Sequence, residues 1–256
     1  MSAYHTPVLL NEAIEYLNVI SDGKYIDATL GGGGHAVAIK VKGGKVLGLD
    51  QDSEAIENSK DLVDVAVKTN FSHLEEVARQ HNWIPAQGVL LDLGVSMHQF
   101  SEGRRGFSIQ NDGPLDMRMG DSAVTAAELV NQLSVEQLSS LFRDFGEIVG
   151  AKALAQKIVN ARPLTTTSQL ASICGKWSQQ AFQALRIAVN DELGALTSVI
   201  PQIKNVLNHG GRAVVISFHS LEDRIVKNEF KDWGIMLTKK PVEGERGSKL
   251  RAYQKI

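Results

Sequence analysis

Three aspartates and a run of four glycines form the pattern in this sequence that could do chemistry. The glycines, residues 31–34, lie just beyond the apolar segment 24–29, and Asp27 stands four positions before the first of them. Since glycine has no Cβ, such a turn lets backbone N–H groups approach a ligand closely. Asp50 and Asp92 end two later apolar segments. We expect the three carboxylates to meet at the carboxyl edge of one parallel sheet, where ligands of such folds bind.

This pattern admits two cofactors and favours one of them. Gly31, Gly33 and Ala36 match the dinucleotide-binding motif, and Asp50 is placed to accept hydrogen bonds from ribose hydroxyls. Nicotinamide cofactors and S-adenosylmethionine both present such a ribose. Asp27 would repel a pyrophosphate, whereas it would attract the ammonium and sulfonium groups of S-adenosylmethionine. The three acids therefore favour S-adenosylmethionine, although any one of them alone could simply cap a helix or turn.

Alternating strands and helices must position these residues. The periodicity predicts strands over 24–29, 45–50, 65–68 and 88–95, separated by helices over 35–42, 53–62 and 72–81. Ser53 is the expected cap of the second helix. Phe71 follows the third strand, where it can stack on an adenine ring or pack in the core. This order of elements is typical of a parallel sheet wrapped by helices.

The alternation stops after the fourth strand. Five stretches have apolar residues at helical spacing, namely 125–133, 135–144, 151–161, 168–175 and 181–189. Ser134 is the expected cap of one of them, and Thr167 or Ser168 of another. Strand signals return at 211–218, 234–238 and 250–254, after a helix near 191–207. We therefore expect an α/β domain, residues 1–100 and 186–256, interrupted by an all-helical insertion over 101–185.

Composition restricts the compartment and the partners. No apolar run approaches the roughly 20 residues that span a bilayer, and the first residues lack the features of a signal peptide. A single cysteine, Cys174, excludes an internal disulfide and a thiolate-cluster metal site. These features favour the cytoplasm and give no indication of a membrane partner. The net charge is −2, yet residues 223–256 hold nine basic and five acidic side chains, either a nucleic-acid patch or a solvated surface.

Several long strings are shared with one family. They are HTPVLLNE at 5–12, YIDATLGGGGH at 25–35, LLDLGVS at 90–96, RGFS at 105–108, GPLDMRM at 113–119, FQALRI at 182–187 and SFHSLEDR at 217–224. Through them nearly the whole chain resembles the bacterial methyltransferases that modify N4 of a cytidine in the decoding region of 16S ribosomal RNA. The sequence departs from that family at Met97 and His98, which replace Ser-Pro, and in a reduced basic motif near the C-terminus.

The resemblance implies a class I S-adenosylmethionine-dependent methyltransferase fold with an inserted RNA-recognition domain. It implies 16S rRNA, within the small ribosomal subunit, as the partner, and no metal. The cofactor contacts that it implies are Gly33, Gly34, His35, Asp50, Phe71, Asp92 and Gln99. Asp27 is added on the charge argument alone. Two alternative functions for the same fold are a non-catalytic ribosome-assembly factor and a nicotinamide-dependent dehydrogenase.

The expected reaction suggests two catalytic residues. An exocyclic amine of cytosine is a poor nucleophile, and a group that accepts its hydrogen bonds and aligns it would help. Asp92 ends the fourth strand and is the natural acceptor, although the resemblance also allows it a cofactor role. Ser96 is the second candidate.

The target base must leave its stack, so cations and aromatic rings are expected to hold the RNA. The candidates for substrate binding are Arg105, Arg118, His219 and Arg224, with Arg104, Phe107 and Phe218 beside them in the sequence. The arginines have an alternative in salt bridges to Asp112, Asp116 and Asp121. An alternative role for His219 is to bind a metal with Glu222 and Asp223, although no second histidine stands at ligand spacing.

Overall fold

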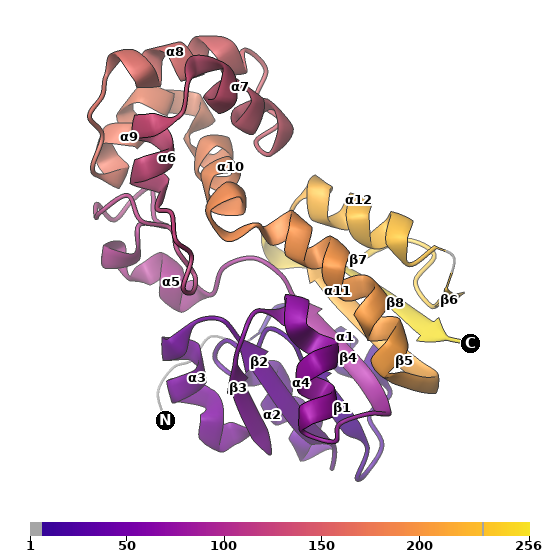
Figure 1. Ribbon diagram of the computed structural model, residues 1–256. Coiled ribbons are helices and arrows are strands. Elements are labelled where there is room, and N and C mark those ends of the chain that lie inside the picture. The colour runs from indigo at the N-terminus through magenta and orange to yellow at the C-terminus, as the bar shows by residue number, and fades with distance from the viewer. Residues whose placement is uncertain (1–6, 232) are drawn as a thin grey trace. The chain divides into compact units, whose positions relative to one another are not determined.

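The computed structural model describes residues 7–231 and 233–256, and these divide into two compact units (Figure 1). The sheet unit comprises Met1–Gly94 and Leu193–Ile256, and the helical unit comprises Val95–Glu192. The sequence placed these borders near residues 100 and 186. Helix α10 (Ser178–Asn190) is continuous, and both Leu185 and Val189 pack in the core of the helical unit, so the second border falls after this helix.

The sheet unit is built on one sheet, which has eight strands within the described residues. The strands are β1 (Lys24–Asp27), β2 (Lys45–Asp50), β3 (Val65–Lys68), β4 (Ala86–Asp92), β5 (Leu207–Ser217), β6 (Gly234–Met236), β7 (Val242–Glu243) and β8 (Lys249–Lys255). Their order is β3-β2-β1-β4-β5-β8-β6, with β7 also on β8. The first five strands are parallel, and β8 runs antiparallel to its three neighbours. The order reverses between β1 and β4, which makes this the switch point where a ligand crevice forms.

Helices cover both faces of this sheet. Helices α4 (Leu74–Gln80), α11 (Glu192–Val206) and α12 (Ser220–Glu229) share one apolar core with the strands, and α1 (Leu10–Leu17), α2 (Gly34–Val41) and α3 (Ser53–Ser59) share the other (Figure 1). In β4, Val89 and Leu91 lie in the first core and Leu90 in the second. Because the parallel strands are buried on both faces, their sequences are continuous runs of apolar residues.

The predicted strands 45–50 and 65–68 are confirmed as β2 and β3, while other boundaries differ. The predicted helix 53–62 ends as α3 at Ser59 and continues as a separate 3-10 turn, Lys60–Leu62. The cap prediction was wrong, because Asp52 rather than Ser53 caps α3: its Oδ1 accepts a hydrogen bond from Glu54 N at 3.0 Å.

The helical unit contains α5 (Met97–Ser101), α6 (Ala126–Gln132), α7 (Val135–Asp144), α8 (Ala151–Asn160), α9 (Thr167–Cys174) and α10. Capping boxes start four of them, α5, α6, α7 and α9, and Ser134 caps α7 as predicted. The cap of α9 is Thr166, not Thr167 or Ser168. The aperiodic segment before α6 is tied to α10 by Asn190, whose side chain bonds Met119 N and Met117 O, both at 2.8 Å.

None of the helices over 7–231 and 233–256 is long and apolar enough to span a membrane.

Candidate functional site

The three aspartates meet at the carboxyl edge of the sheet, as expected. Asp27 pairs in register with Gly48 and Leu90, which precede Asp50 and Asp92 by two positions each. Side chains two positions apart on a strand share a face. All three carboxylates therefore belong to the face that α1 and α2 cover. They act on one another electrostatically, because the charge of Asp50 raises the pKa of Asp27 and that of Asp27 raises the pKa of Asp92.

The glycines of the loop are required for three different reasons. Gly31 has φ +48° and open space where a Cβ would stand, with the nearest atom 3.9 Å away. Gly33 caps α2 at φ +75°, and a Cβ there would lie 2.8 Å from Leu62. At Gly34 a Cβ would lie 2.2 Å from Cγ of Pro7. The missing side chain at Gly34 thus makes room for the chain's own N-terminal segment, which the sequence argument did not anticipate.

Asp50 holds the glycine loop in place. Its Oδ2 accepts a hydrogen bond from Gly31 N and its Oδ1 one from Asp52 N, both at 2.8 Å. Burial raises the pKa of this carboxyl to about 6. Each carboxylate oxygen has a second lone pair, so the predicted acceptance of a ribose hydroxyl remains chemically open.

Asp27 is the most deeply buried acid of the three. Its side chain is 1% exposed and, among the residues that the structure describes, accepts one hydrogen bond, from Thr29 N at 3.3 Å. Burial raises its pKa to about 7. A ligand that brings positive charge would allow this group to ionise, which is the behaviour expected of a carboxylate that meets an ammonium or sulfonium.

Asp92 lies across the switch point from the loop. Its backbone N–H donates to Thr29 Oγ1 at 2.6 Å, and its Oδ2 lies 3.7 Å from Nδ1 of His35. Oδ1 is buried without a hydrogen-bond partner among the described residues. Burial, followed by the charges of Asp27 and Glu222, raises the pKa of Asp92 to about 8. Burial lowers the pKa of His35 to about 4, so the imidazole is neutral beside this carboxyl near pH 7.

Phe71 follows β3 as predicted and opens a 3-10 turn, Phe71–His73. Asn70 caps this turn by accepting a hydrogen bond from Ser72 N at 2.9 Å. The ring is half-buried and packs against the core that α4 covers. The alternative prediction, that Phe71 packs in the core, is thus confirmed. The exposed part of the ring is still available to stack on an adenine.

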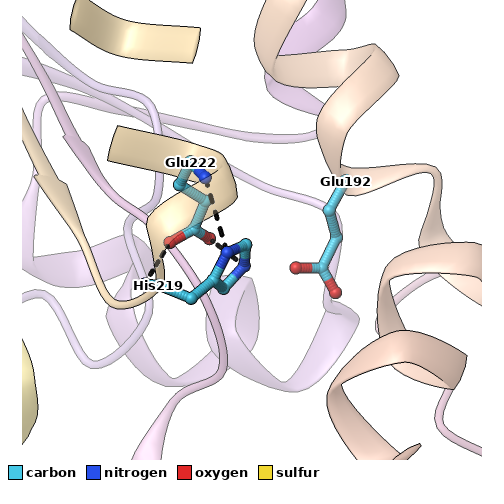
Figure 2. Close-up of side chains that lie close together, drawn as sticks. All are labelled: Glu192, His219 and Glu222. Carbon is cyan, nitrogen blue, oxygen red and sulfur yellow. Dashed lines mark hydrogen bonds and ion pairs between the residues drawn. The ribbon is translucent and has the colours of Figure 1, made fainter. Parts of the chain in front are cut away.

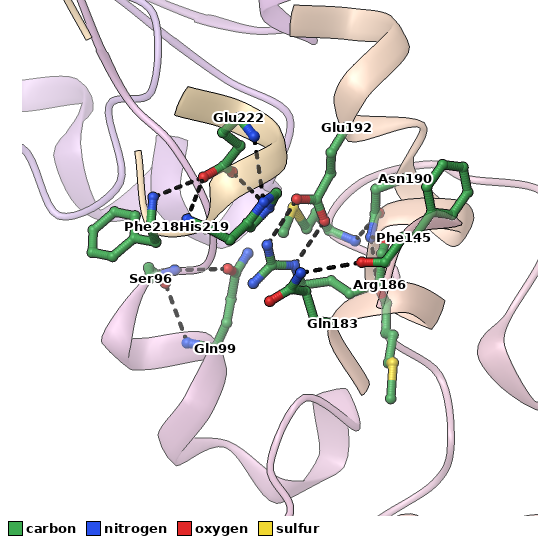
Figure 3. Close-up of polar contacts among 12 residues, drawn as sticks. Ser96, Gln99, Phe145, Gln183, Arg186, Asn190, Glu192, Phe218, His219 and Glu222 are labelled. Carbon is green, nitrogen blue, oxygen red and sulfur yellow. Dashed lines mark hydrogen bonds and ion pairs between the residues drawn. The ribbon is translucent and has the colours of Figure 1, made fainter. Parts of the chain in front are cut away.

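Ser96 and Gln99 belong to the helical unit and are used to start α5 (Figure 3). Ser96 Oγ accepts a hydrogen bond from Gln99 N at 3.2 Å, and Ser96 N donates to Gln99 Oε1 at 3.0 Å. This capping box gives both side chains a structural role that the sequence argument missed, although a serine followed three residues later by glutamine is its usual signature.

The arginines after β4 are engaged within the helical unit. Arg118 forms a two-pronged pair with Asp116, with both contacts at 2.8 Å, as the salt-bridge alternative foresaw. Arg105 donates to the backbone carbonyl of Arg118 at 3.2 Å. Phe107 is buried in the helical core and does not present a ring for stacking. In the FQALRI string, Arg186 pairs with Glu192 through contacts of 2.8 and 2.9 Å (Figure 3).

His219 and Glu222 form the capping box that starts α12, a helix the sequence argument missed (Figure 2). Nδ1 of His219 accepts from Glu222 N at 3.4 Å, and Glu222 Oε2 accepts from Phe218 N at 2.8 Å. Nε2 of His219 lies 3.2 Å from Glu222 Oε1 without the alignment of a hydrogen bond. Arg224 is exposed on α12.

Asp223 and Arg251 pair at 2.6 and 3.1 Å, which fastens α12 to β8. The Asp223 carboxylate is thereby occupied, which removes it from the alternative metal site with His219 and Glu222. The basic C-terminal segment also loses part of its surface charge, since Arg251 is 6% exposed and Lys255 Nζ donates to two backbone carbonyls.

The residues at the carboxyl edge fit S-adenosylmethionine. Asp27 and Asp92 are buried acids with raised pKa values, which a cationic ligand would stabilise in their ionised forms. Asp92 Oδ1 has no hydrogen-bond partner within the described part of the chain, and the space beside the Cα of Gly31 is open. Several predicted cofactor residues already serve the protein's own structure: Gly34 packs against Pro7, Gln99 bonds Ser96, Asp50 holds the glycine loop and Phe71 packs against the core.

Comparison with known proteins agrees with this site. The model of the MraW methylase family matches residues 2–243. A ribosomal RNA small subunit methyltransferase H from Symbiobacterium thermophilum is 46% identical over 91% of this chain and 81% of its own. One from Acidobacterium capsulatum is 41% identical over 98% of both chains.

A solved structure from Clostridium thermocellum that carries the name rRNA-methylase shares the fold, with a TM-score of 0.50, 12% identity and full coverage of both chains. The sheet order and the mixed α/β architecture are those of class I methyltransferases. The chain thus belongs to the MraW methylase family, and it is a methyltransferase whose cofactor is S-adenosylmethionine.

Proposed function

We propose that this methyltransferase methylates the exocyclic N4 amine of a cytidine in the decoding region of 16S ribosomal RNA. The relatives named for small-subunit ribosomal RNA support the substrate class, and the strings shared with the cytosine-N4 family support the position. The observation that carries the chemistry is Asp92 Oδ1, a buried carboxylate oxygen at the switch point with no hydrogen-bond partner among the described residues. An amine N–H is the kind of group that such an oxygen accepts.

We assign the cofactor to the carboxyl edge of the sheet. Asp27 faces the cationic methionine part, Asp50 accepts from the ribose, and the exposed part of Phe71 meets the adenine. Gly33, Gly34, His35, Asp92 and Gln99 complete the proposed contacts. When bound there, S-adenosylmethionine supplies a methyl group activated by the positive charge on sulfur.

Asp92 then acts on the acceptor amine. Burial raises the pKa of Asp92 to about 8, and the positive charge of the bound cofactor would favour the ionised form. The carboxylate then accepts an amine N–H, which favours a pyramidal nitrogen whose lone pair is free to attack the methyl carbon. As the new C–N bond forms and the C–S bond breaks, Asp92 takes one amine proton. The carboxylate loses its negative charge in the step that removes the positive charge from sulfur. The buried site therefore stays balanced in charge, which matters where solvent does not compensate.

RNA binding is proposed for both units. Arg105 and Arg118 in the helical unit, with His219 and Arg224 at the start of α12, are the candidate contacts. Arg118 would present the outer edge of a guanidinium that Asp116 already holds. A net charge of −2 favours a structured small subunit over naked RNA, since fit can there supplement electrostatics. Such a substrate places the reaction in the cytoplasm.

A direct assay tests this function. Small subunits that lack the modification are incubated with the enzyme and S-adenosylmethionine, and the 16S rRNA is digested for nucleoside mass spectrometry. We expect N4-methylcytidine in the decoding region. Methylation of another base or another position would refute the assignment, and so would cofactor binding without turnover.

A further inference from the structure

We propose that His35 is a positioning residue for Asp92, which holds Oδ2 of the carboxylate so that Oδ1 is presented to the acceptor amine. The inference deepens the proposed function and rests on it. It divides the two oxygens of one carboxylate between two partners, one from the protein and one from the substrate.

The geometry around Asp92 supports this division. Nδ1 of His35 lies 3.7 Å from Oδ2, whereas Oδ1 is buried and has no hydrogen-bond partner among the described residues. The distance exceeds that of a formed hydrogen bond, and catalytic contacts of this kind commonly tighten only in the reacting complex. The Asp92 backbone is fixed by its bond to Thr29 Oγ1. The side chain of Asp92 can still rotate about its own torsion angles, and the contact with His35 would restrain that rotation.

The imidazole is buried, and its Nε2 has no hydrogen-bond partner among the described residues. His35 is 5% exposed in the first turn of α2. The backbone of Val8 makes a contact that raises the pKa of His35, and only its carbonyl, an acceptor, favours the protonated ring in this way. Pro7 fills the space beside Gly34, one residue before His35. At the other end of this N-terminal segment, Leu9 fills the space beside Gly244. Residues 7 and 9 are thus packed against Gly34 and Gly244.

The charged groups around Asp92 are Asp27 from β1, His35 from α2 and Glu222 from α12. Both carboxylates oppose its ionisation. Of these three neighbours, the imidazole is the one that adds no negative charge beside Asp92. In the methyl transfer the amine proton passes to Oδ1, the new C–N bond forms and the C–S bond breaks. Nδ1 keeps its contact with Oδ2 throughout and neither gains nor loses a proton overall.

Two substitutions at one position test the proposal. Asn places an amide nitrogen close to the position of Nδ1, so His35→Asn keeps the contact with Asp92. Phe keeps the ring and its packing but has no nitrogen, so His35→Phe removes the contact. His81→Asn, at an exposed histidine beyond α4, is the matched control. The readouts are kcat on unmethylated small subunits, the Kd of S-adenosylmethionine by calorimetry, and the titration midpoint of Asp92 by carbon NMR.

We expect His35→Phe to lower kcat at saturating S-adenosylmethionine by about 10- to 100-fold, beyond any weakening of the Kd that follows from the loss of a proposed cofactor contact. We expect the Asp92 midpoint to move by at least about half a pH unit in this variant and to stay in place in His35→Asn, which retains kcat within about threefold. Equal behaviour of the two variants, or a loss confined to cofactor affinity, would overturn the proposal.

The measurements distinguish a failure of this proposal about His35 from a failure of the proposed function. If the wild-type enzyme transferred no methyl group to small subunits, the assignment of the reaction would fall. The titration needs neither RNA nor turnover. A midpoint that moves in His35→Phe and not in His35→Asn would then still support the contact with Asp92, and an unmoved midpoint would refute it.

Discussion

At the residue scale, the site is defined by acids that the fold keeps out of water. Asp27, Asp50 and Asp92 lie within electrostatic reach of one another, and burial raises the pKa of each. Such a cluster costs stability unless a cation or protons compensate it. A methyl donor with positive charges on sulfur and nitrogen provides that compensation. We therefore propose that Asp27 and Asp92 serve the cofactor and the reaction, while Asp50 also holds the glycine loop.

Asp27 should make stability depend on pH in a defined direction. Its native pKa of about 7 exceeds the ordinary value of 3.8, so the native state holds this proton over a range where the unfolded state has lost it. Stability from this group is complete below about pH 4 and is lost as pH rises to about 7, by at most about 4 kcal/mol. We expect Asp27→Asn to gain stability relative to wild type between pH 4.5 and 8, as measured by urea unfolding without cofactor.

His35 contributes in the opposite direction, because its pKa is lowered and its contribution is lost as pH falls from 6.5 to about 4. It is present in both proteins and cancels, so the difference between them reports Asp27 together with its effect on the pKa of Asp92. A difference in unfolding free energy that stays constant with pH would contradict the account of Asp27.

Ser96 is expected to matter more for α5 than for chemistry. Ser96→Ala removes the acceptor for Gln99 N and should cost about 1 kcal/mol of local stability. Turnover should fall by no more than about fivefold at saturating cofactor. Hydrogen exchange at α5 and steady-state kinetics measure the two effects. A loss of kcat comparable to that of an Asp92 variant would return Ser96 to the catalytic residues.

At the element scale, the N-terminal segment and the glycine loop are one packed structure. Pro7 and Leu9 lie against Gly34 and Gly244, two positions where the absence of a Cβ makes the contact possible. The loop before α2 is therefore shaped by residues far away in the sequence as well as by its own glycines. His5 and Thr6 of the shared N-terminal string lie outside the described residues.

Gly34→Ala tests this packing. Its Cβ would stand 2.2 Å from Pro7 Cγ, so we expect a loss of roughly 1–3 kcal/mol of stability, with weaker binding of S-adenosylmethionine. The double variant Pro7→Gly with Gly34→Ala removes the clash and should recover most of the stability. Thermal unfolding and calorimetry report both effects. If the second substitution restored nothing, the clash would not be the cause.

At the scale of the whole molecule, local patterns predicted the elements better than the contacts between them. The strands β2 and β3 carry plain apolar runs between polar residues, and their bounds were confirmed. Helix α12, with the sequence SLEDRIVKNE, was missed because few apolar residues mark its inner face. The convergence of three acids followed from strand parity, which a sequence carries.

The remaining features depend on partners that no local pattern reveals. Pro7 is distant from Gly34 in sequence, and the pair between Asp223 and Arg251 joins a helix to a strand 28 residues later. Arg118 could be assigned to RNA or to Asp116 from sequence, and only the folded rotamer shows the pair. The secondary structure around a local motif was therefore predictable, whereas the hydrogen-bond and ion-pair partners of its residues were not.

The most direct test of the central claim is the rate at which Asp92→Asn forms N4-methylcytidine on unmethylated small subunits at saturating S-adenosylmethionine. Asn keeps the size of the side chain and removes the proton acceptor. The account predicts a kcat at least about 100-fold below wild type, with cofactor binding still measurable by calorimetry. Wild-type turnover by Asp92→Asn would show that the carboxylate does not act on the amine.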